Sequence, residues 1–289
     1  MSTSEEAPVE FQNVSKLFRQ KNGQPFYANR NLSFRVRQGE VVAIVGETGC
    51  GKSTSFQMLL GLLRPDEGQV RVLGYNPFNQ HSGLLGAVGI VFQNDRLLPW
   101  RTAADNVAFG LEVLRVPTAE RLAIAHTWLD RVGLKGFEHA YPHELSGGMR
   151  QRVSIARAFA IGPKVLYADE AFTALDELTA ARIRNELLAL VKETRITTLF
   201  ITHSVPEAVD VAQRILVFGR PGKVVREINR DGALAQGKSV RAIEEMVREG
   251  LAAAHAPAVA EVGAADLCGG IGAARAATNL VADPPQRLG

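Results

Sequence analysis

Cysteine is scarce in this sequence of 289 residues, which contains two, Cys50 and Cys268. Two cysteines are too few for the disulfide framework of a small secreted protein, so we expect a reducing compartment. The first ten residues lack the basic and apolar regions of a signal peptide. No apolar run reaches the roughly 18 residues needed to cross a bilayer. These absences predict a soluble cytoplasmic chain that depends on another protein for any membrane span.

A strong excess of either charge is also lacking. Lys and Arg number 33 and Asp and Glu number 30, which gives a net charge of +3. This small excess does not indicate a nucleic-acid-binding protein. The 46% of hydrophobic and 22% of charged residues are ordinary for a globular protein with a buried core. This balance excludes a mainly disordered chain, a collagen-like chain and a coiled-coil rod.

Apolar strand-like runs alternate with helical patterns along most of the chain. The β-branched run at 41–45 is typical of a strand buried on both faces, and a helix is expected from about Lys52 to Leu63. Other strand-like segments are 11–18, 31–37, 69–73, 88–92, 164–168 and 198–201, and other helical ones are 121–132, 149–159 and 178–191. The alternation predicts an α/β fold whose largely parallel sheet binds its ligand at the carboxyl ends of the strands.

The segment between the strand at 41–45 and its helix fits the pattern G-x-x-x-x-G-K-[ST]. Its residues are Gly46, Glu47, Thr48, Gly49, Cys50, Gly51, Lys52 and Ser53, and Thr54 follows them. Glycines let successive backbone N–H groups converge on phosphate oxygens, which the helix N-terminus also faces. Lys52 would bind the β- and γ-phosphates, and Ser53 would bind Mg²⁺. The alternative, a glycine-rich turn with a surface lysine, is disfavoured by the flanking strand and helix. Within the loop, Cys50 fits a small filler better than a reactive thiol.

Two adjacent carboxylates, Asp169 and Glu170, end the apolar run at 164–168. Asp169 suits a Mg²⁺ ligand beside a phosphate loop, and Glu170 suits a general base that polarises the attacking water. Gln93 and His203 also stand alone after apolar runs. A lone histidine is more often structural, but at the carboxyl end of a strand His203 would lie where such sheets bind nucleotide.

Leu145-Ser146-Gly147-Gly148-Met149, followed by Arg150-Gln151-Arg152, is a specific signature. With it, residues 9–230 resemble the nucleotide-binding subunit of an ATP-binding-cassette (ABC) transporter, and the motifs occur in that family's order. The resemblance implies a P-loop NTPase cassette with a RecA-like core, an antiparallel β subdomain and a helical subdomain that carries the signature. It also implies hydrolysis of ATP to ADP and phosphate with Mg²⁺.

By this resemblance, two cassettes pack head to tail and enclose two ATP molecules. Ser146, Gly147 and Gly148 of one subunit would face the phosphate loop of the other. Gln93 would contact the metal or the water and His203 would hold the γ-phosphate. Asp176 would link the two sites across the interface.

The same resemblance places an aromatic residue against the adenine. Phe18 matches that position best, Phe26 and Tyr27 are rivals, and a phenylalanine of the core is the alternative for Phe18. Ala171 stands where the family usually has proline after the glutamate. We therefore expect altered local stiffness at Ala171 and retained hydrolysis.

Arg96-Leu97-Leu98-Pro99-Trp100 and the segments 141–144 and 205–208 resemble the importer subgroup for nitrate, sulfonates and taurine. The implied partners are a second copy of the chain, an integral-membrane permease and, indirectly, a periplasmic or extracellular substrate-binding protein, with no nucleic acid. The subunit would lie peripherally on the cytoplasmic face of the inner membrane. The segment 94–108 would receive a permease helix, with Pro99 and Trp100 as exposed anchors or as core filling.

Three other functions share these motifs. Another ABC import system remains open. A DNA-repair ATPase usually carries long coiled-coil insertions and a translation ATPase usually carries two cassettes, and neither feature occurs in this sequence.

The sequence divides into four segments. We expect a flexible N-terminus at 1–8, the ATP-binding cassette at 9–230 and a helical extension at 231–250, with Val240, Ile243 and Val247 on one face. The alanine-rich segment 251–289 lacks periodicity and is expected to be a disordered tail. An inert appendage is the simpler interpretation of this tail, and a regulatory module is the alternative.

Overall fold

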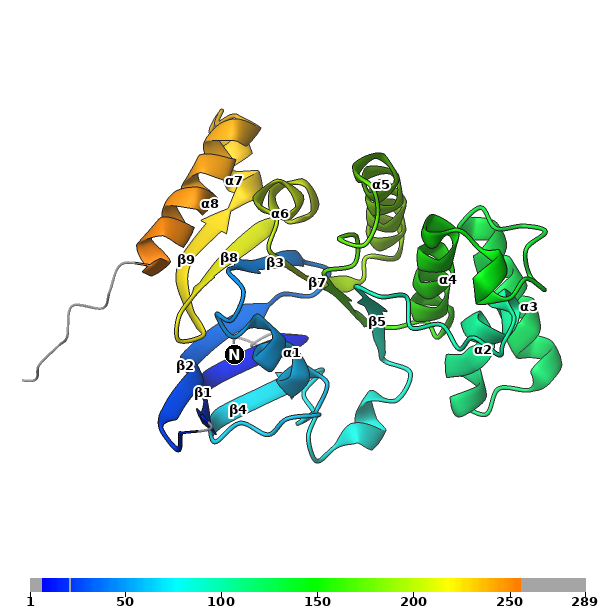
Figure 1. The fold of residues 1–289 in the computed structure, drawn as a ribbon, viewed down its shortest axis with the longest axis horizontal. Coiled ribbons are helices and arrows are strands. Elements are labelled where there is room, and N and C mark those ends of the chain that lie inside the picture. The colour runs from blue at the N-terminus through cyan, green and yellow to red at the C-terminus, as the bar shows by residue number, and fades with distance from the viewer. Residues whose placement is uncertain (1–6, 21, 256–289) are drawn as a thin grey trace, which may run out of the picture. The chain divides into compact units, whose positions relative to one another are not determined.

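The computed structural model describes residues 7–20 and 22–255. Cys268 and the part of the expected tail from residue 256 onward lie outside the described residues. Figure 1 shows a six-stranded sheet of order β5-β6-β7-β3-β8-β9 and a three-stranded sheet of order β2-β1-β4. The strands are β1 (Val9–Arg19), β2 (Pro25–Val36), β3 (Val41–Gly46), β4 (Glu67–Val72), β5 (Val88–Phe92), β6 (Val165–Asp169), β7 (Thr197–Thr202), β8 (Arg214–Gly219) and β9 (Lys223–Asn229). The helices are α1 (Lys52–Leu59), α2 (Ala103–Val113), α3 (Thr118–Arg131), α4 (Gly147–Ala160), α5 (Glu177–Thr194), α6 (Val205–Val211), α7 (Arg230–Ala235) and α8 (Val240–His255), with short 3₁₀ turns at His81–Leu84 and Pro142–Glu144.

The larger sheet confirms the largely parallel α/β fold that the sequence predicts. Strand β3 is parallel to both β7 and β8, and β5, β6 and β7 are parallel to one another. The pairing of β8 with β9 is antiparallel. The carboxyl ends of β3, β5, β6 and β7 therefore lie along one edge of the sheet.

Alternate residues of β3 enter different hydrophobic cores. Val42 and Ile44 pack toward the core shared with the three-stranded sheet and α1, whereas Ala43 and Val45 pack toward the core under the other helices. Figure 1 shows α5 and α6 on one side of the larger sheet and α1 with the smaller sheet on the other. Because both faces are covered, the strand has no polar face, which explains its continuous β-branched sequence.

The smaller sheet is the antiparallel β subdomain expected from the family resemblance. Strand β2 begins at Pro25, earlier than the strand-like pattern from residue 31, because Phe26 and Tyr27 pair with Phe18 and Leu17 of β1. Alternation of apolar and polar residues does not reveal the strand there, because consecutive aromatic residues at this end of β2 are exposed.

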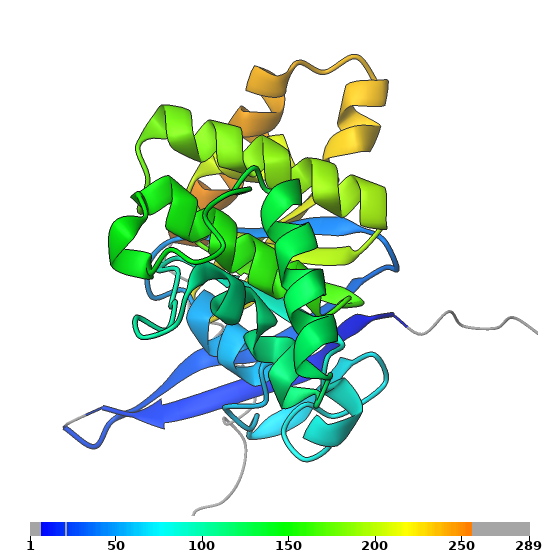
Figure 2. The ribbon, with the colours of Figure 1, turned by 90° about the vertical axis from the view of Figure 1, so that its right-hand side faces the viewer.

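Helices α2, α3 and α4 pack against one another and form the helical subdomain, which faces the viewer in Figure 2. They lie between β5 and β6 in the sequence, although these strands are neighbours in the sheet. The α2 helix begins after Thr102, whose side chain accepts a hydrogen bond from the Asp105 backbone. The buried Asn106 amide bonds to Leu98 and so shapes the segment before the helix.

The expected end of the first helix at Leu63 is wrong, because α1 ends at Leu59. Gly61 has φ +68°, and its amide bonds back to the Met58 carbonyl. A Cβ at this position would lie 2.0 Å from the Pro77 carbonyl oxygen. The left-handed glycine and its close neighbour terminate the helix.

The C-terminal amphipathic pattern does form a helix, α8, in which Ile243 and Val247 are fully buried. The helix packs on α6, β8 and β9 and continues to His255. Residues 251–255, which the sequence analysis assigns to the tail, thus belong to the helix.

Candidate functional site

The strand order brings the predicted site segments together. Val45 of β3 pairs with Thr202 of β7, Ile201 pairs with Asp169 of β6, and Asp169 pairs with Phe92 of β5. The phosphate loop, His203, Glu170 and Gln93 each follow directly after one of these strands. Four segments distant in the sequence therefore end at adjacent positions of one sheet edge.

The phosphate loop connects β3 to α1 as the pattern predicts. Gly49 and Gly51 have φ +79° and +102°, which glycine adopts without strain. A Cβ at Gly51 would also lie 2.4 Å from the Ala28 carbonyl oxygen. Cys50 is buried, and burial raises the pKa of its thiol, so the residue fits a loop filler rather than a reactive nucleophile.

Lys52 is 6% exposed and lies within the loop. Its ammonium donates hydrogen bonds to the Gly46 carbonyl and, at 3.0 Å, to the Glu47 carbonyl. The alternative of an ordinary surface lysine is therefore wrong. A buried cation among backbone dipoles can bind the oxygens of a polyphosphate.

Glu170 and His203 lie side by side beyond the ends of β6 and β7. The Glu170 Oε1 atom is 3.1 Å from the His203 Nδ1 atom. Glu170 has φ +47°, and its backbone N–H donates to the Ile201 carbonyl at 2.8 Å. A non-glycine residue in the left-handed region is uncommon, and such strain is often found at functional positions.

Asp169 ends β6 and is half-buried. Burial and the negative charge of Glu170 raise the pKa of the Asp169 carboxyl, while the cations Arg96 and Lys52 oppose this rise. The oxygen donors of Ser53, Asp169 and Gln93 are hard ligands of the kind that Mg²⁺ takes. Within the described residues no group of three or more His, Cys, Asp or Glu side chains forms a metal site by itself.

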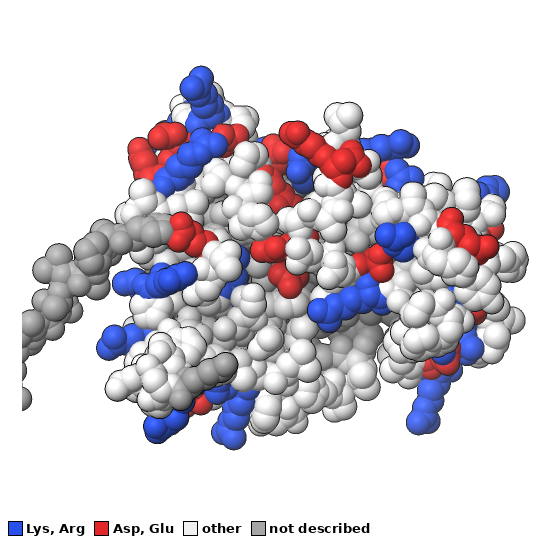
Figure 3. All heavy atoms as spheres, viewed as in Figure 1, with Lys and Arg blue, Asp and Glu red and all other residues white. Residues whose placement is uncertain are grey.

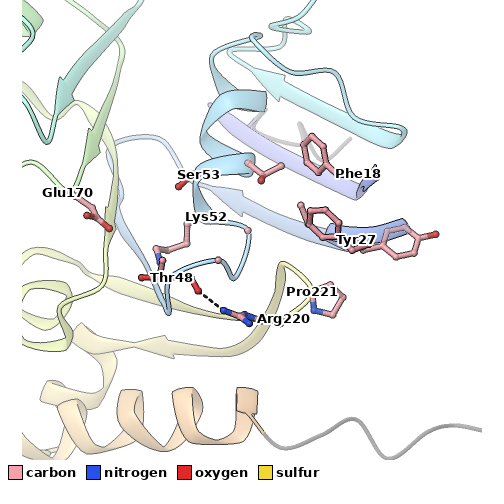
Figure 4. Close-up of a pocket in the computed structure, with 13 residues that line it drawn as sticks. Phe18, Tyr27, Thr48, Lys52, Ser53, Glu170, Arg220 and Pro221 are labelled. Atoms are coloured by element: carbon pink, nitrogen blue, oxygen red, sulfur yellow. Dashed lines mark hydrogen bonds between the residues drawn. The ribbon is translucent and has the colours of Figure 1, made fainter. Parts of the chain in front are cut away.

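A pocket of about 680 Å³ extends from this edge toward the smaller sheet (Figure 4). It is lined by Phe18, Phe26, Tyr27, Ala28, Thr48, Gly49, Gly51, Lys52, Ser53, Thr54, Glu170, Arg220 and Pro221. Aromatic side chains form one end and the phosphate loop with Glu170 forms the other. The arrangement can hold a flat base and a polyphosphate at the two ends of one ligand.

The aromatic end contains all three residues that the sequence considers. Phe18 and Phe26 are stacked with ring centroids 5.8 Å apart, and Tyr27 is their neighbour in the lining. Phe18 is half-buried rather than enclosed in the core. Phe18 therefore stays a candidate for the residue that contacts the adenine. The sequence analysis considers single aromatic rings, whereas in the structure Phe18 and Phe26 form a stacked pair.

A second hollow, of about 430 Å³, lies against the same loop and is lined by Gly46, Glu47, Thr48, His203 and Leu251. Thr48 lines both hollows, and the Glu170–His203 pair connects them. The end of α8 therefore reaches the surroundings of the phosphate loop through Leu251.

The signature residues lie outside the 680 Å³ pocket. Ser146 is the N-cap of α4 and accepts a hydrogen bond from the Met149 backbone at 3.3 Å, and Gly147 and Gly148 begin the helix. Asp176 similarly caps α5 through the Thr179 backbone N–H. None of these residues lines the 680 Å³ pocket, and Gln93 is also absent from its lining.

Gln151 is a buried residue that the sequence analysis does not assign to the site. Its amide donates to the Ala171 carbonyl at 2.7 Å and to the Phe92 carbonyl at 3.2 Å. The signature helix is thereby tied to the segments that precede Gln93 and follow Glu170. The position of Gln151 directly after the signature is the only feature of the sequence that points to this connecting role.

Arg220 lines the pocket and is also not identified by the sequence analysis. It lies in the turn between β8 and β9, far in sequence from the motifs. An isolated Arg-Pro-Gly turn matches no phosphate-binding sequence pattern. The position of Arg220 in the pocket therefore follows only from the tertiary structure.

A buried parallel strand, a glycine loop and a helix that begins at a buried lysine define a phosphate-loop nucleotide-binding ATPase. A family model described as ABC transporter matches residues 29–173. The chain belongs to the ABC transporter family. Its ATP-hydrolysing activity and its cassette fold agree with the sequence prediction.

The chain has close relatives within this family. It is 41% identical over 224 residues to an uncharacterized ABC transporter ATP-binding protein of Methanocaldococcus jannaschii, a match that covers 77% of this chain and 82% of the relative. It is 40% identical over 235 residues to the taurine import ATP-binding protein TauB of Yersinia pestis, a match that covers 80% of this chain and 90% of the relative. A solved dimeric ATP-binding cassette in a post-hydrolysis state with ADP and Pi is 32% identical, with a TM-score of 0.68 over 77% of this chain and 98% of that one.

The surface charge is mixed. On the face drawn in Figure 3, Lys and Arg side chains are interspersed with Asp and Glu rather than gathered into one patch. Among the described residues, no helix combines the length and apolar character that crossing a bilayer requires.

Proposed function

We propose that this chain is the ATP-hydrolysing subunit of an importer that takes up a small anion, such as taurine, another sulfonate or nitrate, through a separate permease. The observation that carries the catalytic part is the pocket in which a phosphate loop with buried Lys52 faces Glu170. Glu170 in turn contacts His203, which lines the adjoining hollow. The relatives named for taurine import support the class of cargo.

The phosphate loop binds the triphosphate in this proposal. Backbone N–H groups of the residues from Glu47 to Thr54 surround the β- and γ-phosphates, and Lys52 exchanges its loop carbonyls for phosphate oxygens. The α1 helix directs the positive end of its dipole at the same group. Phe18, with Phe26 beside it, stacks on the adenine.

Ser53, Asp169 and Gln93 would hold Mg²⁺ through their oxygen atoms. The ion would neutralise developing negative charge on the transferred phosphoryl group. Asp169 would then remain ionised despite its half-buried position beside Glu170.

Glu170 accepts a proton from the attacking water. His203 positions the Glu170 carboxylate through the 3.1 Å contact of its Nδ1 atom, and its other ring nitrogen faces the γ-phosphate. The left-handed backbone of Glu170, bonded to the Ile201 carbonyl, helps to hold the carboxylate beside His203.

A second copy of the chain completes the site. Ser146, Gly147 and Gly148 begin α4 away from their own subunit's pocket, so their helix N-terminus is available for the nucleotide of another subunit. A head-to-tail dimer would place this second phosphate-binding helix opposite the phosphate loop, with Asp176 between the two sites.

The segment 94–108 provides the docking surface for the permease. Pro99 and Trp100 are both exposed, Trp100 by 72%, and Phe109 of the following helix is also exposed. The core-filling alternative for Pro99 and Trp100 does not fit this exposure. Docking there would hold the subunit peripherally on the cytoplasmic face of the inner membrane.

The docking segment is linked to the signature helix by two arginines of α4. Arg157 donates to the Asp95 and Arg96 carbonyls at 2.6 and 2.8 Å, and Arg150 pairs with the Asp95 carboxylate at 3.0 Å. Movement of the permease at 94–108 can therefore reach the signature without passing through the pocket.

Replacing Arg157 with methionine should uncouple the permease from hydrolysis. The change leaves two backbone carbonyls without a charged donor, at a cost of about 1–3 kcal/mol each. We expect permease-stimulated ATPase activity and uptake to fall about tenfold, while ATP affinity stays within about twofold. Arg182→Met on the exposed side of α5 is the matched control. Equal losses of ATP affinity and uptake would contradict the coupling role.

Reconstitution with the permease tests the function itself. The chain should co-purify with an integral-membrane permease and support ATP-dependent uptake of one of the three anion types into proteoliposomes. Uptake of a cargo outside this class would refute the anion assignment. A soluble ATPase that is retained on DNA and binds no permease would refute the importer.

The remaining assignment concerns the division of the chain. We propose that residues 9–230 form the ATP-binding cassette and that residues 231–250 form a helical extension of it.

A further inference from the structure

The turn Arg220–Gly222 between β8 and β9 forms part of the pocket wall. Arg220 and Pro221 line the pocket together with the phosphate loop and the aromatic end. Figure 4 shows Arg220 beside Thr48, with Pro221 toward Tyr27. The turn therefore lies along the middle of the pocket, between the two ends that the proposed function assigns to triphosphate and base.

A buried asparagine fixes this turn against the site. The Asn29 side-chain N–H₂ donates to the Ser55 hydroxyl at 3.0 Å and the Gly51 carbonyl at 3.3 Å, and it contacts the Gly222 carbonyl at 3.4 Å. Asn29 is fully buried and immediately follows the pocket residue Ala28. One side chain thus connects β2, the phosphate loop and the turn.

Gly222 packs closely against the backbone of β2 and of the phosphate loop. A Cβ at Gly222 would lie 2.3 Å from the Ala28 carbonyl oxygen. The Gly222 Cα is also the atom that a Cβ at Gly51 would meet at 2.9 Å. The position of Arg220 relative to the loop is therefore set by tightly packed backbone rather than by a mobile surface segment.

The Arg220 guanidinium approaches the loop directly. Its Nη2 atom donates to the Thr48 carbonyl at 2.7 Å, and a Cβ at Gly49 would lie 3.1 Å from the same atom. This bond uses one of the five N–H donors of a guanidinium. Arg220 is otherwise exposed to the pocket, and a planar cation with several donors matches the geometry of a phosphate group.

We propose that Arg220 is a nucleotide-binding residue that contacts the sugar and α-phosphate portion of the ligand. This inference rests on the proposed nucleotide site. With the base at one end of the pocket and the β- and γ-phosphates at the other, the sugar and α-phosphate would lie next to the β8–β9 turn. The contact is shared by ATP and ADP, so Arg220 contributes to nucleotide retention before and after hydrolysis. It differs in this respect from Glu170 and His203, which act at the γ-phosphate.

The test compares ligands that contain the sugar and the α-phosphate with one that contains neither. Full-length Arg220→Gln and Arg220→Met proteins are titrated with ATP, ADP and inorganic pyrophosphate in the presence of Mg²⁺, by displacement of a fluorescent ADP. We expect affinity for ATP and ADP to fall about tenfold, equally for the two. Affinity for pyrophosphate should change less than about twofold, because pyrophosphate can occupy the β- and γ-phosphate positions without an α-phosphate or a sugar. Lys223→Ala, which removes an exposed cation from the start of β9, should leave all three affinities unchanged.

Each other outcome overturns the inference. Wild-type affinity for ADP in the Arg220 variants would show that the side chain does not contact the nucleotide. An equal loss for ADP and pyrophosphate would show that Arg220 shapes the phosphate loop and contacts neither the sugar nor the α-phosphate. Thermal melts check that each variant is folded. Both variants change the same exposed side chain, so the result is taken from whichever variant melts like the unsubstituted protein. Failure of the unsubstituted protein to bind ATP would refute the proposed function instead.

Discussion

Replacing Glu170 with glutamine should abolish ATP hydrolysis while leaving ATP binding intact. Glutamine has the same size, but its amide cannot accept the proton of the attacking water. Loss of a positioned general base lowers the rate by about 10²–10⁴-fold. Phosphate release measured with the assembled transporter reports this loss, and ATP titration reports the retained binding.

The same variant should accumulate a closed dimer with ATP, because the nucleotide that joins the subunits is not consumed. Size-exclusion chromatography with and without ATP measures this effect. Glu67→Gln, on the exposed face of β4, is the matched control for the change of charge. Normal hydrolysis by the Glu170 variant would exclude Glu170 as the base. A loss of ATP binding would indicate that the carboxylate serves the pocket rather than the reaction.

Replacing Lys52 with alanine should remove nucleotide binding and hydrolysis together. Lys52 is buried in the loop and already bonded to its carbonyls, so the ammonium needs little reorganisation to meet phosphate oxygens. Loss of such a preorganised donor lowers turnover by about 10²–10³-fold. We expect ATP affinity to fall on the same order, and both quantities are measured on the protein with its permease.

Lys192→Ala, at an exposed position of α5, is the control for loss of one positive charge. Because Lys52 is buried, a thermal melt is needed for each variant. Wild-type hydrolysis by a folded Lys52 variant would overturn the assignment of the whole loop. A variant that loses turnover and keeps ATP affinity would restrict Lys52 to the reaction step.

The features that the sequence predicts best are encoded in local patterns. The phosphate loop is read from eight consecutive residues, because the backbone there needs glycine at left-handed positions such as Gly51. Strands such as β5 are read from unbroken apolar runs, because both faces of the sheet are covered. The sequence analysis places Glu170 and His203 each after a strand, whereas the contact between them depends on the pairing of β6 with β7 in the structure.

Other features depend on contacts between distant segments. The end of α1 at Leu59 is set by Gly61 against Pro77, and no helical pattern contains that contact. Gln151 reads as an ordinary helix residue until its amide is seen to bond to Ala171 and Phe92. The buried amide of Asn29 likewise acquires its role from three partners that lie in three different segments.

The sequence by itself determined the class of fold, the phosphate loop and the ABC signature, since each is encoded in short-range spacing that sets local backbone geometry. The tertiary structure alone decided that Arg220 joins the pocket, that three aromatic residues share its far end, and that the signature helix lies outside it. These results arise from packing, which brings together residues whose separation along the chain carries no pattern.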